Sequence, residues 1–198
     1  ALVDTDGSEV LNYTLTGVSG TLSAGTNNGG GSWTLTAAQA IGLTVTPPLR
    51  DSDDFVITVV ARAVDETAPE ATIQDTISVT VNPVSNAPNL SVTNTTSGDE
   101  DTAITLTITG SLVDTDGSEV LTYELTGVSG TLSAGTNNGG GSWSLTSGQV
   151  AGLTVTPPLH DSDDYVITVT AVATDGVAVA ATTQDTISVT VNPVSDTP

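Results

Sequence analysis

The chain has 198 residues, and its 23 Asp and Glu against two Lys and Arg give a formal net charge of −21. This excess of negative charge excludes nucleic acid as a partner and argues against direct contact with anionic membranes. The absence of Cys excludes disulfides and thiolate metal sites. Hydrophobic residues nevertheless make up 37% of the chain and alternate with Thr, which favours β-sheets over disorder.

The sequence repeats with a period of 110 residues. Residues 1–88 align with residues 111–198 without a gap and differ at twenty of the 88 positions. We therefore predict two modules, at 1–88 and 89–198. The first module lacks a counterpart of Asn89–Gly110, a segment that reads as two strands. The chain thus reads as a fragment, in which a strand from another repeat or from another chain could complete the first module.

The complete module reads as a series of short strands. The pattern alternates with period two or is bounded by turn residues throughout. Thr131–Thr146 reads as two short runs around an Asn/Gly turn. The other predicted strands are Ala103–Gly110, Glu119–Thr126, Gly152–Pro158, Tyr165–Thr174 and Asp185–Val194. Residues 147–152 form at most one helical turn.

Seven or eight short strands in one period, several of them ended by Pro, predict a specific architecture. We expect an all-β fold of tandem immunoglobulin-like or cadherin-like β-sandwiches. Each module has one Trp, Trp33 or Trp143. A single Trp is expected to fill the core rather than to offer a sugar-stacking surface.

Acidic residues gather in the loops between the predicted strands. Alternate loops of an antiparallel sandwich lie at opposite ends, so counting loops assigns each acidic cluster to the leading end, where the chain enters a module, or to the trailing end, where it leaves. The count places the DTDGSE motif, Asp114–Glu119, and Asp175 at the leading end. It places two acidic loops, Asp99–Asp101 and Asp161–Asp164, at the trailing end. One strand in the middle of the module breaks the alternation and stays unassigned.

Stacked modules would bring five to seven carboxylates together around the linker Asn82–Pro88, with no Lys nearby. Their repulsion predicts a bound cation, and oxygen ligands of this kind favour Ca²⁺ over Mg²⁺. The expected ligands are Asp51, Asp53, Asp54, Asn86, Asp114, Asp116, Glu119 and Asp175; the equivalent or outer positions are Asp4, Asp6, Glu9, Asp65, Asp161, Asp163, Asp164, Asp99, Glu100 and Asp101. The alternatives are a solvated acidic turn for DTDGSE and the opening of a strand for Asp99–Asp101.

The order of motifs, from DTDGSE through GTNNGGGSW to TISVTVNPVS, resembles the cadherin-like or immunoglobulin-like tandem repeats of giant bacterial RTX adhesins. These adhesins are exported by type I secretion, and the resemblance covers essentially the whole chain. It implies calcium-stiffened extender modules that project a distal ligand-binding domain from the bacterial cell surface during adhesion and biofilm formation. Their partners would be neighbouring repeats of the same polypeptide. The resemblance implies calcium ligands in Asp51–Asp54, at Asn86, and at Asp114 with Asp116.

Two other classes of function are alternatives to a structural extender, or spacer. A calcium-dependent module that binds a ligand or a carbohydrate is the alternative, but near-identity of the two copies favours the spacer. An enzyme is not expected, because the only His, His160, is replaced by Arg50 in the other copy. The repeats therefore share no His-based catalytic constellation.

Overall fold

The computed structural model describes residues 9–65 and 69–195. The chain divides into two compact units, Ala1–Asn82 and Pro83–Pro198. Within the described ranges the regular elements are β-strands and one short 3₁₀ helix, which confirms the predicted all-β fold class. The linker residues Pro83–Pro88 belong to the second unit, ahead of the module boundary expected at Asn89.

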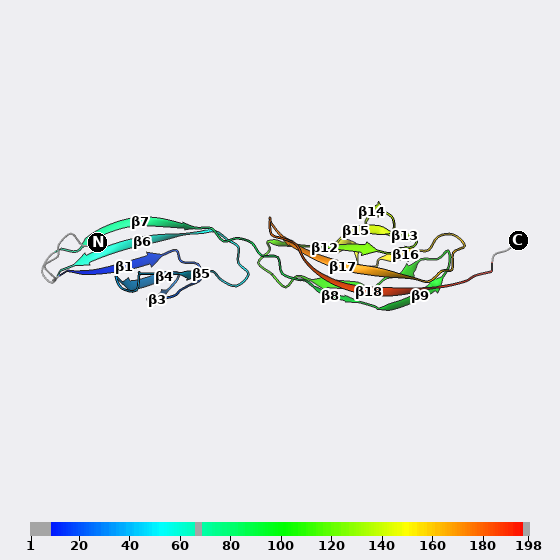
Figure 1. Cartoon of the computed structure of the whole chain (residues 1–198), viewed down its shortest axis with the longest axis horizontal. Helices are drawn as coiled ribbons and strands as arrows, with labels where there is room; N and C mark the ends of the chain where they lie inside the picture. Colours follow the sequence, from blue (N-terminus) through cyan, green and yellow to red (C-terminus); the bar gives the residue numbers. More distant parts are fainter. Residues whose placement is uncertain (1–8, 66–68, 196–198) are drawn as a thin grey trace. The chain divides into compact units, whose positions relative to one another are not determined.

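The second unit is a β-sandwich with two layers. Its six-stranded sheet has the order β14-β15-β12-β17-β18-β9, and the opposite layer contains the pair β11-β8 and the trio β10-β16-β13 (Figure 1). The strands are β8 (Asn89–Val92), β9 (Thr95–Asp99), β10 (Ile104–Thr105), β11 (Ile108–Ser111), β12 (Glu119–Thr126), β13 (Thr131–Leu132), β14 (Thr136–Gly139), β15 (Ser142–Thr146), β16 (Thr154–Thr156), β17 (Tyr165–Asp175) and β18 (Ala181–Asn192); the 3₁₀ helix η1 is Ser147–Gln149.

The core of this unit follows from strict alternation along its long strands. In β12, Leu121, Tyr123 and Leu125 are buried and the residues between them are not. In β17 the same period buries every second residue from Ile167 onward. Each strand therefore turns one face toward the opposite layer, as a sandwich requires.

The segment Asn89–Gly110 was predicted as two strands and forms four. β8 pairs antiparallel with β11 in one layer, and after Thr93 the chain crosses to the other layer, where β9 runs parallel to β18. The return strand is divided at Leu106, whose backbone N–H donates to the carbonyl of Leu153 at 2.9 Å. A strand that changes partners in this way shows a continuous alternating pattern in sequence, so its break is invisible there.

The stretch 131–146 also contains one strand more than expected. β13, β14 and β15 follow one another, where two short runs were predicted. The turn into β14 requires Gly135, with φ of +99°, because a Cβ there would lie 2.8 Å from the Leu145 side chain. With this extra strand, the strands from β12 to β18 reverse direction one after another, which removes the irregularity in the loop count.

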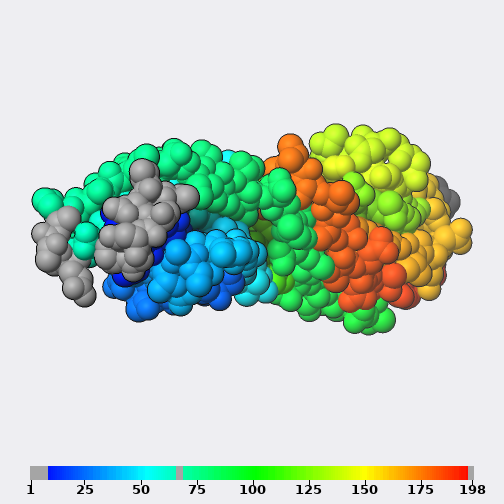
Figure 2. Space-filling view, turned by 60° about the vertical axis from the view of Figure 1, so that its left-hand side comes forward, coloured from blue at the N-terminus to red at the C-terminus, as the bar shows by residue number. Residues whose placement is uncertain are grey.

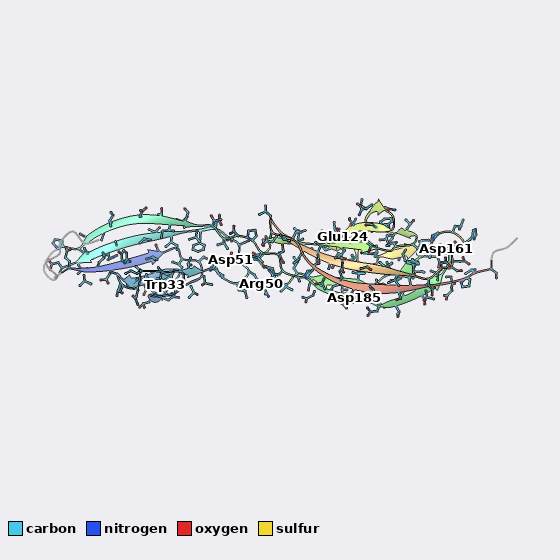
Figure 3. All side chains as sticks on the ribbon, viewed as in Figure 1. Trp33, Arg50, Asp51, Glu124, Asp161 and Asp185 are labelled. Carbon is cyan, nitrogen blue, oxygen red and sulfur yellow. The ribbon has the colours of Figure 1, made fainter. Side chains whose placement is uncertain are left out.

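The first unit carries the same strands from β12 onward and a smaller core. Its main sheet has the order β3-β4-β1-β6-β7, and β2 pairs with β5. The strands are β1 (Val10–Thr16), β2 (Thr21–Leu22), β3 (Thr26–Gly29), β4 (Ser32–Thr36), β5 (Val45–Thr46), β6 (Phe55–Val64) and β7 (Ala71–Val79). Trp33 on β4 and its counterpart Trp143 are both only 6% exposed, which confirms that they fill the cores (Figure 3).

Candidate functional site

The leading end of the second unit buries three carboxylates. Glu119 is the first residue of β12 and shares the inward face of Leu121, while Asp175 is the last residue of β17 and shares the inward face of Ala173. The strand register places Glu119 directly opposite Asp175. Asp114 precedes β12. The exposed fractions are 3% for Asp114, 6% for Glu119 and 4% for Asp175.

These residues hold the linker that leads into the unit. A carboxylate oxygen of Glu119, Oε1, accepts a hydrogen bond of 2.5 Å from the backbone N–H of Asn86. The backbone N–H of Asp175 donates to Ser85 Oγ at 3.0 Å. The hydroxyl of Thr183 donates to the carbonyl of Pro88 at 2.6 Å. Side chains and backbone of the sandwich thus contact three of the six linker residues in this unit.

Within the second unit, no Lys or Arg balances the charge of this cluster, Asp114, Glu119 and Asp175. Both Arg residues of the chain, Arg50 and Arg62, lie in the first unit, and there is no Lys. Glu119 Oε2 is buried without a hydrogen-bond partner. A buried carboxylate oxygen without a donor or a cation is costly, because the low-dielectric interior does not replace the water that it has lost.

Asp116 belongs to the same DTDGSE motif but is exposed. Its carboxylate accepts hydrogen bonds from the hydroxyl of Ser118 at 2.6 Å and from the Ser118 backbone N–H at 2.8 Å. These two bonds hold the pKa of Asp116 below its usual value. Asp114 and Glu119, by contrast, line an open hollow of about 560 Å³ together with Gly117 and Ser147. Asp116 is thus exposed, whereas Asp114 and Glu119 of the same motif are buried.

At the trailing end, carboxylates accept hydrogen bonds from the last residues of β18 and from the chain just after it. Glu100, 7% exposed, accepts a hydrogen bond of 2.6 Å from the backbone N–H of Val194. Asp164 accepts one of 2.9 Å from the backbone N–H of Val191. Asp99 accepts one from the side-chain amide of Asn192 at 3.2 Å. Asp99 is the last residue of β9, and Glu100 and Asp101 lie in the turn after it, so the alternative that these residues open a strand is wrong.

The two acidic loops predicted at the trailing end do meet. Asp101 Oδ1 accepts a hydrogen bond of 2.8 Å from the backbone N–H of His160, whose Nδ1 lies 3.6 Å from Asp101 Oδ2. Asp161 lies in the same loop, next to the start of β17 (Figure 3), and its Oδ1 accepts a bond from the Asp163 backbone N–H. Tyr165, with a buried hydroxyl that has no partner, has its pKa raised to about 12 by burial and by the charge of Asp161.

The acidic loop Asp51–Asp54 of the first unit has the same local bonds as Asp161–Asp164 of the second. Asp54 accepts a hydrogen bond of 2.8 Å from the backbone N–H of Val81, as Asp164 does from Val191. Asp51 accepts one of 3.0 Å from Asp53. Glu9 and Asp65 are half-buried. Asp4 and Asp6 lie outside the described residues.

Within residues 9–65 and 69–195, no three His, Asp or Glu side chains are grouped so that they alone could hold a metal ion. In the same ranges, no helix has the length and apolar character needed to cross a membrane. Sequence reasoning missed Ser85 in the linker. It also missed the inward direction of Glu119 and Asp175, although both continue the alternation of buried residues along their strands.

No family model matches the sequence, and no curated protein matches it. Solved structures do match. The chain is similar to mouse cadherin-23 EC22-24, with 15% identity, a TM-score of 0.49 and coverage of 97% of this chain and 57% of that one. It is similar to protocadherin gamma B2 extracellular cadherin domains 1-5, with 16% identity, a TM-score of 0.46 and coverage of 94% and 34%.

A third match is the human desmocollin-1 ectodomain, with 13% identity, a TM-score of 0.35 and coverage of 93% of this chain and 35% of that one. The chain spans from about a third to little more than half of the length of these solved chains. At such identities the likeness concerns the fold alone.

Proposed function

We propose that the two units are calcium-stiffened extender modules of a long bacterial adhesin exposed outside the cell. One observation carries this proposal. The leading end of the second unit buries Asp114, Glu119 and Asp175, in a unit without Lys or Arg, and leaves Glu119 Oε2 without a partner. A cation bound at this end would relieve both the repulsion and the lost hydration.

The donor atoms fit calcium. Ca²⁺ takes six to eight oxygen ligands and accepts carboxylates, backbone carbonyls, amide oxygens and water in flexible geometry, whereas Mg²⁺ demands a near-ideal octahedron and keeps its waters. Glu119 and Asp175 are cross-strand neighbours, and Asp114 lines the same hollow as Glu119. Since three acidic side chains do not complete a site by themselves, backbone carbonyls, the Asn86 amide oxygen and water would supply the remaining ligands. Asp116, Asp51, Asp53 and Asp54 remain predicted ligands.

The stiffening follows from the contacts of the linker. Three linker residues are hydrogen-bonded to the sandwich of the same unit. The pairs are Ser85 with Asp175, Asn86 with Glu119, and Pro88 with Thr183. Calcium would hold the Glu119 and Asp175 carboxylates in place, so the linker backbone would lose freedom of movement. A spacer made of such modules needs no catalytic group and tolerates near-identical copies.

The sequence also suggested a module that binds carbohydrate through calcium. Its usual aromatic stacking surface is not available here, because Trp33 and Trp143 are each only 6% exposed. The buried position of both indole rings therefore favours the spacer.

Calorimetry of the full chain in EDTA, in Ca²⁺ and in Mg²⁺ tests the proposal. Calcium is expected to raise the melting temperature of the second unit and to narrow the distribution of shapes seen by small-angle scattering, with Mg²⁺ less effective. The Asp175→Asn variant should lose most of the calcium shift, whereas Glu124→Gln, on the exposed face of β12, should keep it. A melting temperature and a scattering profile that stay the same after chelation would contradict calcium stiffening.

A further inference from the structure

The first unit leaves one apolar sheet face open that the second unit covers. The two units carry the same residues at most of the positions concerned, so one chain contains a matched comparison. Ile77 on β7 is 52% exposed, whereas its counterpart Ile187 on β18 is fully buried. Val79 is half-buried, whereas its counterpart Val189 is buried. Identical side chains thus differ only in what lies over them.

The cover in the second unit is the segment Asn89–Gly110. Its apolar side chains either belong to the core or pack against it, and residues 1–88 contain no counterpart of the segment. The side chains are Leu90, Val92, Ile104, Leu106 and Ile108. In the second unit this segment covers the apolar sheet face. The matching face of the first unit, which contains Ile77 and Val79, has no such cover among the described residues.

The open edge also changes the secondary structure of an identical sequence. Residues 74–85 and 184–195 read QDTISVTVNPVS in both copies. β18 continues to Asn192 and pairs in parallel with β9 over Ser188–Asn192. β7 stops at Val79 and is the edge strand of its sheet. In Figure 2 its blue-green residues form part of the surface of the first unit. Residues 80–82 are thus not part of a strand, although their counterparts beside β9 are.

We propose that this face and edge are a docking site for a further segment with the sequence pattern of Asn89–Gly110. One part would add a parallel strand beside β7, and the returning part would place its three apolar residues over Ile77 and Val79. Addition of a strand to an exposed edge supplies backbone hydrogen bonds, and alternate side chains supply selectivity. An apolar edge without such a partner is prone to non-specific pairing.

Charge complementarity favours the same occupant. In the second unit, His160 has a positive φ of 58° and its backbone N–H bonds to Asp101 of the covering segment. In the first unit, Arg50 occupies the equivalent position with a φ of 62°. An aspartate at the Asp101 position of a docked segment would therefore meet a permanent positive charge, in one of only two Arg residues of the chain. Figure 3 shows Arg50 beside Asp51 in this loop.

The occupant has to be an additional segment, and not the Asn89–Gly110 of a second copy. That segment already buries Ile104, Leu106 and Ile108 in its own unit. An exchange between two copies would uncover one core for each face that it covers, and so would gain nothing. The additional segment carries no such cost.

The test is a fusion of a second copy of Asn89–Gly110 ahead of Ala1 in the full chain. In the repeat Gly110 is followed by Ser111, the counterpart of Ala1, so the fusion keeps the natural junction. Hydrogen exchange with mass spectrometry distinguishes the units, because peptides that contain Ile73 differ in mass from those with Thr183 at the equivalent position. Exchange of the backbone amides in residues 78–82 should slow by about a hundredfold, the protection expected of a paired strand.

The control fusion replaces its Ile104, Leu106 and Ile108 equivalents by Ser and should give no slowing. A further fusion that also carries Arg50→Ala should give less slowing than the first. Unchanged exchange in the first fusion, or equal slowing in the Ser control, would overturn the proposal. So would self-association of the chain without any fusion, measured by analytical ultracentrifugation, if it protected residues 78–82, because a second copy would then be the occupant.

Discussion

Replacing Glu119 by Gln should change the stability of the second unit in opposite directions with and without calcium. In the wild type, Glu119 Oε1 accepts from Asn86 and Oε2 is buried without a partner. Gln keeps an oxygen acceptor for Asn86, removes the charge and offers an amide donor to the facing Asp175. With a chelator present, the variant is therefore expected to be more stable by about 1–3 kcal/mol, the cost of one unsatisfied buried polar group.

Calcium should reverse this order. A ligand at about one hundred times its dissociation constant stabilises the folded state by about 2.7 kcal/mol. The wild type gains this free energy of unfolding, and the variant, which has lost one charged ligand, gains little of it. The wild type is then the more stable protein in calcium, although it is the less stable one in chelator.

Urea denaturation of the full chain, followed by circular dichroism in EDTA and in calcium, measures both differences. Glu124→Gln makes the same chemical change on the exposed face of the same strand and should behave as the wild type in both conditions. The reasoning fails if Glu119→Gln is less stable than the wild type in EDTA. It also fails if calcium stabilises both proteins equally.

Three further outcomes are expected. Ile187→Ala should lower the free energy of unfolding by about 2–5 kcal/mol and Ile77→Ala by clearly less, because only the first is fully buried; equal losses in urea denaturation would contradict the two burial states. The neutral form of Tyr165 is favoured by folding, since its folded pKa is about 12 against an ordinary 10.0, so the second unit should lose stability as pH rises from 10 towards 12. Tyr165→Phe should abolish that part of the loss in thermal melts at these pH values. Glu100→Ala should speed exchange of the Val194 amide, measured by NMR, by removing its acceptor, and an unchanged rate would exclude that role.

The strands could be predicted where a single strand runs through a single layer. Glu119–Thr126 has the predicted bounds, because an alternating pattern and clear turn residues surround it. Asn89–Gly110 could not be divided correctly, since it serves both layers and its alternation continues through the crossing. The short strands between Thr131 and Thr146 depend on turns at glycines, and their number follows from tertiary contacts rather than from any local period.

Counting strands could assign each acidic loop to one end of the module, but it could not predict which carboxylates in a loop are buried. Asp114 and Asp116 are two residues apart in one motif, yet the first is buried and the second is exposed. The local turn hydrogen-bonds the Asp116 carboxylate to Ser118, and Asp116 stays exposed. For Glu119 and Asp175 the signal was present, because Glu119 extends the buried face of β12 to its first residue and Asp175 extends that of β17 to its last.

The bond from Asn86 to Glu119 has a consequence for how an array of such modules can change over time. The carboxylate accepts a hydrogen bond from a main-chain N–H, a group that every residue except proline possesses. This hydrogen bond therefore does not depend on the side chain at that position. The two copies do differ there, with Asn86 in one and Asp196 in the other. Any module that keeps the glutamate can follow any linker of this length, so copies could be duplicated, deleted or shuffled without redesigning the joint.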